Sequence, residues 1–371
     1  MRLSKANVIF TVLIGVTIIF VILSDQKPWS NLLTPQHHAA ADGNVNVRSS
    51  GNFTSAAVAA ELNLETTCIH VAFLFVLPDE REEEVLRGKL REKLSKALSS
   101  LVLNKSTSSR NNTTNNSVVV CLHLITNEFT RILTVLPNDV MYKLRLHVQI
   151  HNIDLMYRLL VPYEHALKSN FGNLPLLYYA SFVLHRAFTS VEKLILLDVD
   201  IWLSASIEEL HSWFDQFDET HLIGIAHEQQ PVYGNQLSDY RLSTSNESTV
   251  GLPLPGGNPG FNSGVLLLHL IKLRQSALFE SFINVTTIEM LAQKYRFKGH
   301  LGDQDYYTLI GFEQPRMFKL LPCTWNRQLC KWWKYHTNKY HSNLQFDEYH
   351  SCVGDIKLYH GNCNSAIPTN V

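Results

Sequence analysis

The sequence predicts an α/β protein whose central sheet is covered on both faces. Three apolar runs of strand length, residues 69–77, 118–125 and 191–197, lack polar alternation, and such runs are typical of strands that are buried on both sides. Segments with the apolar spacing of helices lie at 79–103 and 178–186. Strands that alternate with helices along the chain indicate an α/β sheet.

The composition indicates a folded body of substantial size. The chain has 371 residues, of which 45% are hydrophobic and 18% are charged, so it can bury a large core in one big domain or two ordinary ones. The formal net charge of -1 provides no basic face of the kind that nucleic acids attract. We therefore exclude a nucleic-acid partner.

The N-terminus has the features of a membrane anchor. Arg2 and Lys5 precede an uncharged apolar run at 6–23, which is about long enough to cross a thin bilayer. Because the positive residues lie on the short N-terminal side, we expect a cytoplasmic tail at 1–5, a signal anchor at 6–24 and a lumenal remainder. A cleaved signal peptide is the alternative, although no good small-x-small site follows the run directly.

The lumenal part is expected to begin with a stem. Residues 25–65 are polar and have no sustained hydrophobic period, as expected of a flexible segment. A single folded domain is then expected at 66–371. Within it, the low-complexity stretch 104–117 predicts a surface loop, because nothing in it can fill a core.

Sequons and cysteines agree with a lumenal location. Sequons for N-glycosylation occur at Asn52, Asn104, Asn111, Asn112, Asn115, Asn246 and Asn284. Four of the six cysteines crowd near the C-terminus, namely Cys323, Cys330, Cys352 and Cys363. In an oxidising compartment they predict two disulfides with three possible pairings, and a zinc site is the less favoured alternative because close Cys pairs are missing. Cys68 and Cys121 are either buried free thiols or a third disulfide.

Two aspartates carry the first chemical signal. Asp198 and Asp200 follow the apolar run 191–197, and ligands of open α/β sheets bind outside the carboxyl ends of strands. Two carboxylates on either side of one residue can hold a hard cation such as Mg²⁺ or Mn²⁺. For so short a motif, the alternative is that the two carboxylates are solvated or cap a helix and bind no metal.

Three further segments contain residues suited to a ligand site, two in the middle of the chain and one near the C-terminus. Residues 251–270 run from a Gly/Pro loop through Asn262 and Ser263 into an apolar stretch, and these two side chains can hydrogen-bond ligand hydroxyls. At 299–308, we expect Asp303 to cap a helix that holds Gln304 in the site.

Near the C-terminus, His360 precedes Gly361 and lies close to Cys363. It is the best candidate in the tail for a third metal ligand beside the two aspartates. A lone histidine is more often structural, and that alternative stays open here.

The ordered set KLILLDVDIWL, GFNSGVLLL, LGDQDYY and a C-terminal histidine beside a glycine resembles the family 8 retaining glycosyltransferases, the glycogenin-like GT-A enzymes. The strings IGIAHEQQPVY, HLGDQDYYTLIG, CTWNRQLCKWW and KLYHGNCNSAIP are similar to members of that family that transfer xylose. The close resemblance covers about half the chain. It implies a GT-A fold, with a Rossmann-like nucleotide-sugar-binding domain around a mixed, mostly parallel central sheet.

The resemblance also implies roles for individual residues. It implies Mn²⁺, with Mg²⁺ as the alternative, on Asp198, Asp200 and His360. It implies donor or reaction-centre contacts from Asn262, Leu301, Gln304 and Asn362, and acceptor contacts near Trp332 and Trp333. We also expect Ser263, His300 and Asp303 to bind substrate, and Asp200 to act in catalysis together with Gln304 and Asn362. Gln304 is a poor nucleophile because it is an amide, so we expect it to position the donor sugar or stabilise charge at the anomeric carbon.

The implied reaction is transfer of xylose from UDP-xylose, with retention, to xylosyl-glucose on EGF-like repeats of Notch-type receptors. The implied location is the endoplasmic reticulum membrane, with the Golgi as second choice. One stretch departs from the family pattern, because residues 234–239 replace an aromatic-rich run that faces the acceptor. The alternatives are a family 8 enzyme with another donor or acceptor, such as one that adds the first xylose to glucose, and an inactive lumenal glycan-binding protein.

Overall fold

The structure is a computed structural model that describes residues 68–77, 84–108, 119–127, 146–244, 248–336 and 343–368. The expected tail, anchor and stem at 1–65 lie outside these residues. Within the described ranges, no helix is both long enough and apolar enough to span a membrane.

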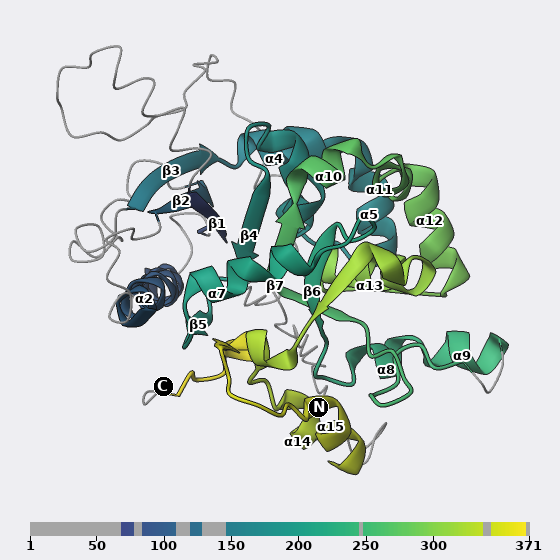
Figure 1. Ribbon diagram of the computed structural model, residues 1–371. Coiled ribbons are helices and arrows are strands. Elements are labelled where there is room, and N and C mark those ends of the chain that lie inside the picture. Colours follow the sequence, from purple (N-terminus) through teal and green to yellow (C-terminus); the bar gives the residue numbers. More distant parts are fainter. Residues whose placement is uncertain are drawn as a thin grey trace, which may run out of the picture.

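A seven-stranded sheet forms the centre of the protein (Figure 1). Its strand order is β3-β2-β1-β4-β7-β6-β8. The strands are β1 (Cys68–Phe75), β2 (Val119–Thr126), β3 (Leu146–Asn152), β4 (Lys193–Leu197), β6 (Ile223–His227), β7 (Phe261–His269) and β8 (Phe318–Leu321). β7 pairs antiparallel with both of its neighbours, and all other pairs in the sheet are parallel. The mixed, mostly parallel sheet expected from the sequence is therefore confirmed.

A small second sheet joins the C-terminal segment to the end of β4. It consists of β5 (Ile201–Leu203), β10 (Leu358–His360) and β9 (Arg327–Gln328), in the order β5-β10-β9. β10 runs antiparallel to β5, with His360 paired to Ile201. This register brings the histidine of the tail beside the turn that contains the two aspartates.

Helices surround the two sheets. The α-helices are α2 (Glu84–Ser108), α4 (Asp154–Leu160), α5 (Glu164–Phe171), α6 (Leu184–Ala187), α7 (Ile207–His211), α8 (Val232–Gln236), α9 (Ser238–Thr244), α10 (Leu270–Gln275), α11 (Ala277–Phe282), α12 (Val285–Lys294), α13 (Asp303–Glu313), α14 (Trp332–His336) and α15 (Asn343–His350). Short 3₁₀ helices are η3 (Val161–Tyr163), η4 (Leu176–Val183), η5 (Ser212–Gln216), η6 (Pro315–Met317), η7 (Cys323–Trp325) and η8 (Asn362–Asn364).

Both faces of the large sheet are buried, which explains the continuous apolar runs of its strands. On β7, Leu266 and Leu268 face a core shared with α4, α5 and α10 to α13, whereas Val265 and Leu267 face a core shared with α2 and α7. Figure 1 shows these two groups of helices on opposite sides of the sheet. A strand covered on both sides needs apolar residues at every position, so its sequence loses the period of two.

Two predicted elements differ from the structure. The helix expected at 178–186 is mostly the 3₁₀ helix η4, which contains a kink at Tyr179 and continues into the single turn of α6. Every residue of η4 is buried, so packing outweighs the preference for a regular α-helix. The loop expected at 104–117 is wrong for its first part, because α2 continues to Ser108; that part contains no Gly or Pro to end the helix.

The cysteines form three disulfides among the described residues. Cys323 pairs with Cys352, and Cys330 pairs with Cys363, so the two predicted C-terminal disulfides are confirmed and the zinc alternative is wrong. Cys68 pairs with Cys121 and joins β1 to β2, so the free-thiol alternative is wrong as well.

Three histidines form a hydrogen-bonded row across neighbouring strands of the sheet. His70 Nδ1 lies 2.9 Å from His123 Nε2, and His123 Nδ1 lies 3.0 Å from His151 Nε2. Phe188 packs edge-on against His123 and His151. Burial holds the pKa of His123 well below its usual 6.5, with His151 and His70 acting in the same direction, and burial lowers the pKa of His151 to about 4. His123 and His151 are therefore neutral in the folded protein at neutral pH.

We expect this row to make the fold sensitive to acid. Below pH 6.5, His123 becomes protonated in the unfolded chain but stays neutral in the folded protein, because its pKa is lowered there. The free energy of unfolding therefore falls as the pH falls. Urea unfolding at pH 7 and pH 5 measures the effect. The wild type should lose about 2 kcal/mol more between these pH values than His123→Leu does.

The exposed histidine His165 provides the control. His165→Leu should leave the pH dependence of the wild type unchanged. An equal pH dependence in wild type and His123→Leu would contradict the assignment of the acid sensitivity to the buried row.

Candidate active site

Asp198 and Asp200 lie directly after β4, at the edge of the sheet predicted from the sequence. They are only 8% and 5% exposed, and His360 is fully buried beside them. His360 Nε2 lies 3.4 Å from Asp198 Oδ2 and 3.4 Å from Asp200 Oδ1. One ligand atom of each residue lies within 4.8 Å of the others. The structure thus brings together the three side chains predicted to hold a metal.

Backbone hydrogen bonds fix these three residues from separate parts of the chain. Asp198 N donates to Gly264 O at 3.0 Å, and Gly361 N donates to Asp200 O at 2.7 Å. Gly264 belongs to β7, and a Cβ at this position would lie 2.2 Å from His360 Cε1. The glycine of the FNSG motif is therefore required to make room for the histidine ring.

Asn326 sets the orientation of His360 and was missed by the sequence analysis. Its Oδ1 lies 3.0 Å from His360 Nδ1. An amide oxygen only accepts, so Nδ1 carries a proton, and Nε2 is the ring atom that faces the aspartates and would bind a metal once it loses its own proton. The amide of Asn326 also donates to Asn262 Oδ1 at 2.9 Å. A polar residue between Trp325 and Arg327 gave no signal of this role, because only the fold places it next to β7.

The donor set fits a divalent cation. Two carboxylates and a neutral imidazole suit Mn²⁺ or Mg²⁺. Burial disfavours a charge on His360, yet the neighbouring carboxylates of Asp198 and Asp200 raise its pKa to about 10. The same negative charge that attracts a proton attracts a metal ion, which binds once the imidazole is deprotonated.

Glu228 holds two of the predicted site residues, Asn262 and Gln304, and the sequence analysis did not identify it. It follows β6 directly, is 1% exposed, and its Oε2 accepts from Asn262 Nδ2 at 3.1 Å and Gln304 Nε2 at 2.9 Å. Burial raises its pKa to about 7, against the opposing effect of the Asn262 hydrogen bond and of His360. The only available signal was a carboxylate beside an apolar strand, in the string IGIAHEQQPVY. Gln304 Oε1 in turn accepts from Ser263 N at 3.3 Å.

The start of α13 differs from the prediction in one respect. Asp303 does not cap the helix, because Gly302 occupies the N-cap with a φ of 74° and no side chain caps it. Asp303 instead accepts from the hydroxyls of Ser181 and Ser263, and burial raises its pKa to about 7. The expected placement of Gln304 in the first turn of a helix beside the site is confirmed.

The other predicted residues occupy varied surroundings. Leu301 is buried in the core, and its backbone N–H donates to Asp305 Oδ2 at 2.7 Å, as does that of His300. Asn362 is 1% exposed, and its Oδ1 accepts from the backbone N–H groups of Leu329 and Cys330. Its Nδ2 is buried without a hydrogen-bond partner among the described residues. A buried donor of this kind needs an acceptor from water or from a ligand.

The two adjacent tryptophans lie on α14. Trp332 stacks on His336 with ring centroids 4.3 Å apart, and Trp333 is partly buried against the core that includes Leu266 and Leu268 of β7. Trp333 Nε1 is buried without a hydrogen-bond partner among the described residues. This position is compatible with packing inside the protein and also with contact to an acceptor sugar. The contact with the acceptor stays a prediction.

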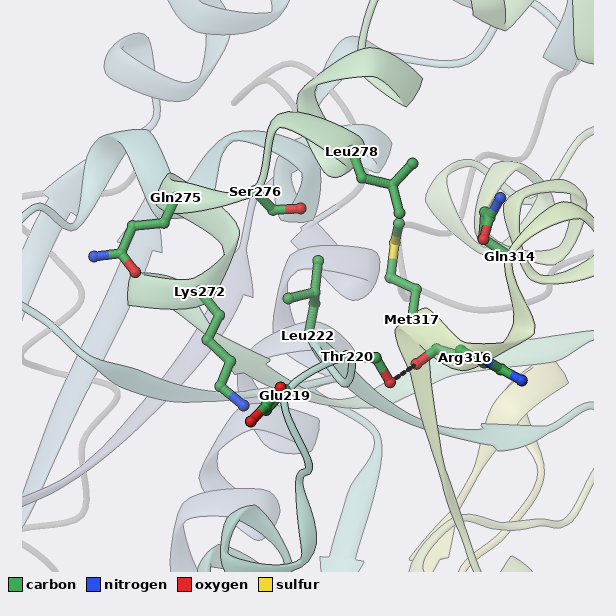
Figure 2. A pocket seen from close by; sticks show the side chains of 10 residues that line it. All are labelled: Glu219, Thr220, Leu222, Lys272, Gln275, Ser276, Leu278, Gln314, Arg316 and Met317. Carbon is green, nitrogen blue, oxygen red and sulfur yellow. Dashed lines mark hydrogen bonds between the residues drawn. The ribbon is translucent and has the colours of Figure 1, made fainter.

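A surface pocket of about 410 Å³ lies elsewhere, at the amino ends of β6 and β8 (Figure 2). Leu222 and Met317 form its floor, while Lys272 and Arg316 lie at its rim. β6 is parallel to β4, since both are antiparallel to β7. The pocket therefore lies at the opposite edge of the sheet from Asp198, and it has no part in the site.

Comparison with known proteins identifies the family. The model for glycosyl transferase family 8 matches residues 51–349. The chain belongs to this family. Human and mouse proteins named xyloside xylosyltransferase 1 are each 38% identical to it over 263 residues. The matched segment is 67% of this chain and 65% of each relative, so the chain spans somewhat less than two thirds of their length.

A solved structure agrees with the family assignment. The apo crystal structure of mouse xyloside xylosyltransferase 1 superposes with a TM-score of 0.69 and 35% identity, over 81% of this chain and 99% of that chain. The fold is therefore GT-A-like, as the sequence motifs implied.

We expect Asn326 to control the affinity for the metal through His360. Asn326→Leu removes the acceptor that fixes the imidazole, and loss of such a partner weakens metal binding about 10- to 100-fold. Asn326→Asp keeps an acceptor for Nδ1 and should retain the metal. Mn²⁺ titration followed by electron paramagnetic resonance measures both affinities. Equal affinities for the two variants would contradict this role.

Gly264 offers a second test of the same geometry. Gly264→Ala forces a methyl group into the ring of His360, so we expect at least a tenfold loss of Mn²⁺ affinity and a destabilisation of about 1–3 kcal/mol. The control is Gly88→Ala on α2, where a Cβ meets nothing within 4 Å. That variant should bind Mn²⁺ normally and gain about 0.5–1 kcal/mol of stability. Unchanged Mn²⁺ binding in Gly264→Ala would show that His360 is not a ligand.

Proposed function

We propose that this protein is a retaining xylosyltransferase that uses UDP-xylose as donor and Mn²⁺ as cofactor. The buried cluster of Asp198, Asp200 and His360 carries the proposal, because its ligands fit a divalent cation at the ligand-binding edge of a GT-A-like sheet. The donor is inferred from the name of the similar human and mouse proteins, xyloside xylosyltransferase 1.

The metal has a defined role in this proposal. A bound Mn²⁺ would be held by the two carboxylates and Nε2 of His360, and it would stabilise the negative charge that develops on the departing β-phosphate. Asn326 keeps the imidazole in the tautomer that leaves Nε2 unprotonated. Burial of the cluster excludes water, which strengthens each of these interactions.

The remaining site residues bind and orient the donor sugar. Glu228 fixes the amides of Asn262 and Gln304 through one oxygen atom, so their side chains are preorganised before the sugar binds. No nucleophile on the far side of the sugar is invoked, and the acceptor hydroxyl attacks from the face that UDP leaves. Gln304 holds the sugar in place, and Glu228 supports positive charge at the anomeric carbon.

The acceptor and the location extend the same proposal. We place the acceptor hydroxyl on xylosyl-glucose of EGF-like repeats, with Trp332 and Trp333 at the acceptor side. We place the chain in the endoplasmic reticulum membrane, anchored by residues 6–24 with the folded domain in the lumen. Three disulfides among the described residues support an oxidising compartment.

A UDP-release assay tests the function. The purified full chain is incubated with Mn²⁺ and UDP-xylose, UDP-glucose or UDP-galactose, with and without a xylosyl-glucose acceptor. We expect UDP to be released from UDP-xylose and from neither of the other donors, and we expect the acceptor to increase the rate of release. Preference for another donor would contradict the proposed substrate, and no release from any donor would indicate a binding protein.

The Asp200→Asn variant tests the metal assignment in the same assay. We expect it to lose more than 100-fold in activity, because the amide removes one negative ligand and the charge that attracts the cation. Its thermal unfolding should remain cooperative. Normal turnover by this variant would refute the metal site.

A further inference from the structure

Lys93 reaches the candidate metal site from α2, a helix that none of the recognised motifs includes. Its Nζ lies 3.6 Å from Asp200 Oδ2 and donates to Asn364 Oδ1 at 2.8 Å. The Lys93 side chain is 22% exposed and Asp200 is 5% exposed. The ammonium group is therefore a partly desolvated positive charge in direct contact with a predicted metal ligand.

Several features hold Lys93 in this place. α2 packs along β5, the strand that follows Asp200. Asn364 adopts a left-handed backbone with a φ of 56°, next to Cys363 with a φ of 55°. The Cys330–Cys363 disulfide ties this turn to the body of the protein. The ammonium thus lies between Asp200 Oδ2 and Oδ1 of the exposed Asn364, at the edge of the site.

The charges of the site change once a divalent cation binds. Without the cation, Lys93 offsets part of the negative charge of Asp198 and Asp200. With Mn²⁺ bound, the cation engages the two carboxylates, and among the residues that the structure describes no carboxylate other than Asp200 pairs with Lys93, which then lies beside a second cation. Two cations this close repel each other strongly in a poorly hydrated site. An anion that binds to both would remove the repulsion.

We propose that Lys93 is a donor-binding residue that contacts the diphosphate of the nucleotide sugar and thereby couples nucleotide binding to metal binding. This inference rests on the proposed function, because it takes a nucleoside diphosphate as the anion. The ammonium turns from Asp200 toward the diphosphate when the metal occupies the carboxylates. A lysine is suited to this exchange, since its charge sits on a flexible stem and binds phosphate oxygens from many directions.

The proposal predicts opposite effects on two affinities. In Lys93→Met, Mn²⁺ alone should bind several-fold more tightly, because the competing positive charge is gone. UDP in saturating Mn²⁺ should bind about 10- to 100-fold more weakly, the loss expected for a charge-assisted hydrogen bond. By linkage, UDP should then increase the Mn²⁺ affinity less than it does in the wild type.

The full chain is used, with Mn²⁺ binding followed by electron paramagnetic resonance and UDP binding by calorimetry. Lys93→Arg keeps the charge and should bind UDP within about threefold of the wild type. Lys96→Met is the control, because Lys96 lies on the same helix, is 62% exposed and pairs with Glu92. It should match the wild type in both affinities. Uridine, which lacks phosphate, should bind Lys93→Met and wild type equally.

Unchanged UDP affinity in Lys93→Met would overturn the proposal. A parallel loss of UDP and uridine binding, with a lowered melting temperature, would assign Lys93 a structural role between α2 and the tail, and would overturn it as well. Failure of the wild type to bind UDP with Mn²⁺ would instead refute the proposed function, and this inference with it.

Discussion

The structure of the site depends on the burial of two carboxylates side by side at the end of β4. Asp198 and Asp200 are largely removed from water, and two negative charges so placed repel each other and lose their hydration. The surrounding chain compensates for this charge with His360 and Lys93, and two backbone hydrogen bonds, from Asp198 to Gly264 and from Gly361 to Asp200, fix the turn. Burying two carboxylates in this way lowers the stability of the fold when no cation is bound, and the same two carboxylates are suited to bind a divalent cation.

The antiparallel strand β7 connects the candidate metal ligands with Glu228 and Gln304. Its amino end lies at the same edge as the carboxyl ends of β4 and β6, which places Asn262 between Asn326 and Glu228. Hydrogen bonds then run from His360 through Asn326 and Asn262 to Glu228 and on to Gln304. Amide side chains suit this chain of contacts, because each both donates and accepts and adds no charge.

The C-terminal segment reaches the site with little regular structure of its own. β9 and β10 have only two and three residues, too few to hold the segment by pairing alone. The disulfides Cys323–Cys352 and Cys330–Cys363 close loops around it and reduce the entropy of the unfolded chain. The covalent links therefore keep His360 and Asn362 in place.

The sequence by itself determined the α/β class, the candidate metal ligands Asp198, Asp200 and His360, and the placement of Gln304 in the first turn of a helix, because these features depend on local apolar runs and on short motifs. The places of Glu228, Asn326 and Lys93 could not be predicted from it, since each of them reaches the site through contacts with residues distant in the chain. Cysteine pairing and the 3₁₀ form of η4 were likewise decided by tertiary packing. Local preference sets what a segment can form, and long-range contacts select the side chains that meet.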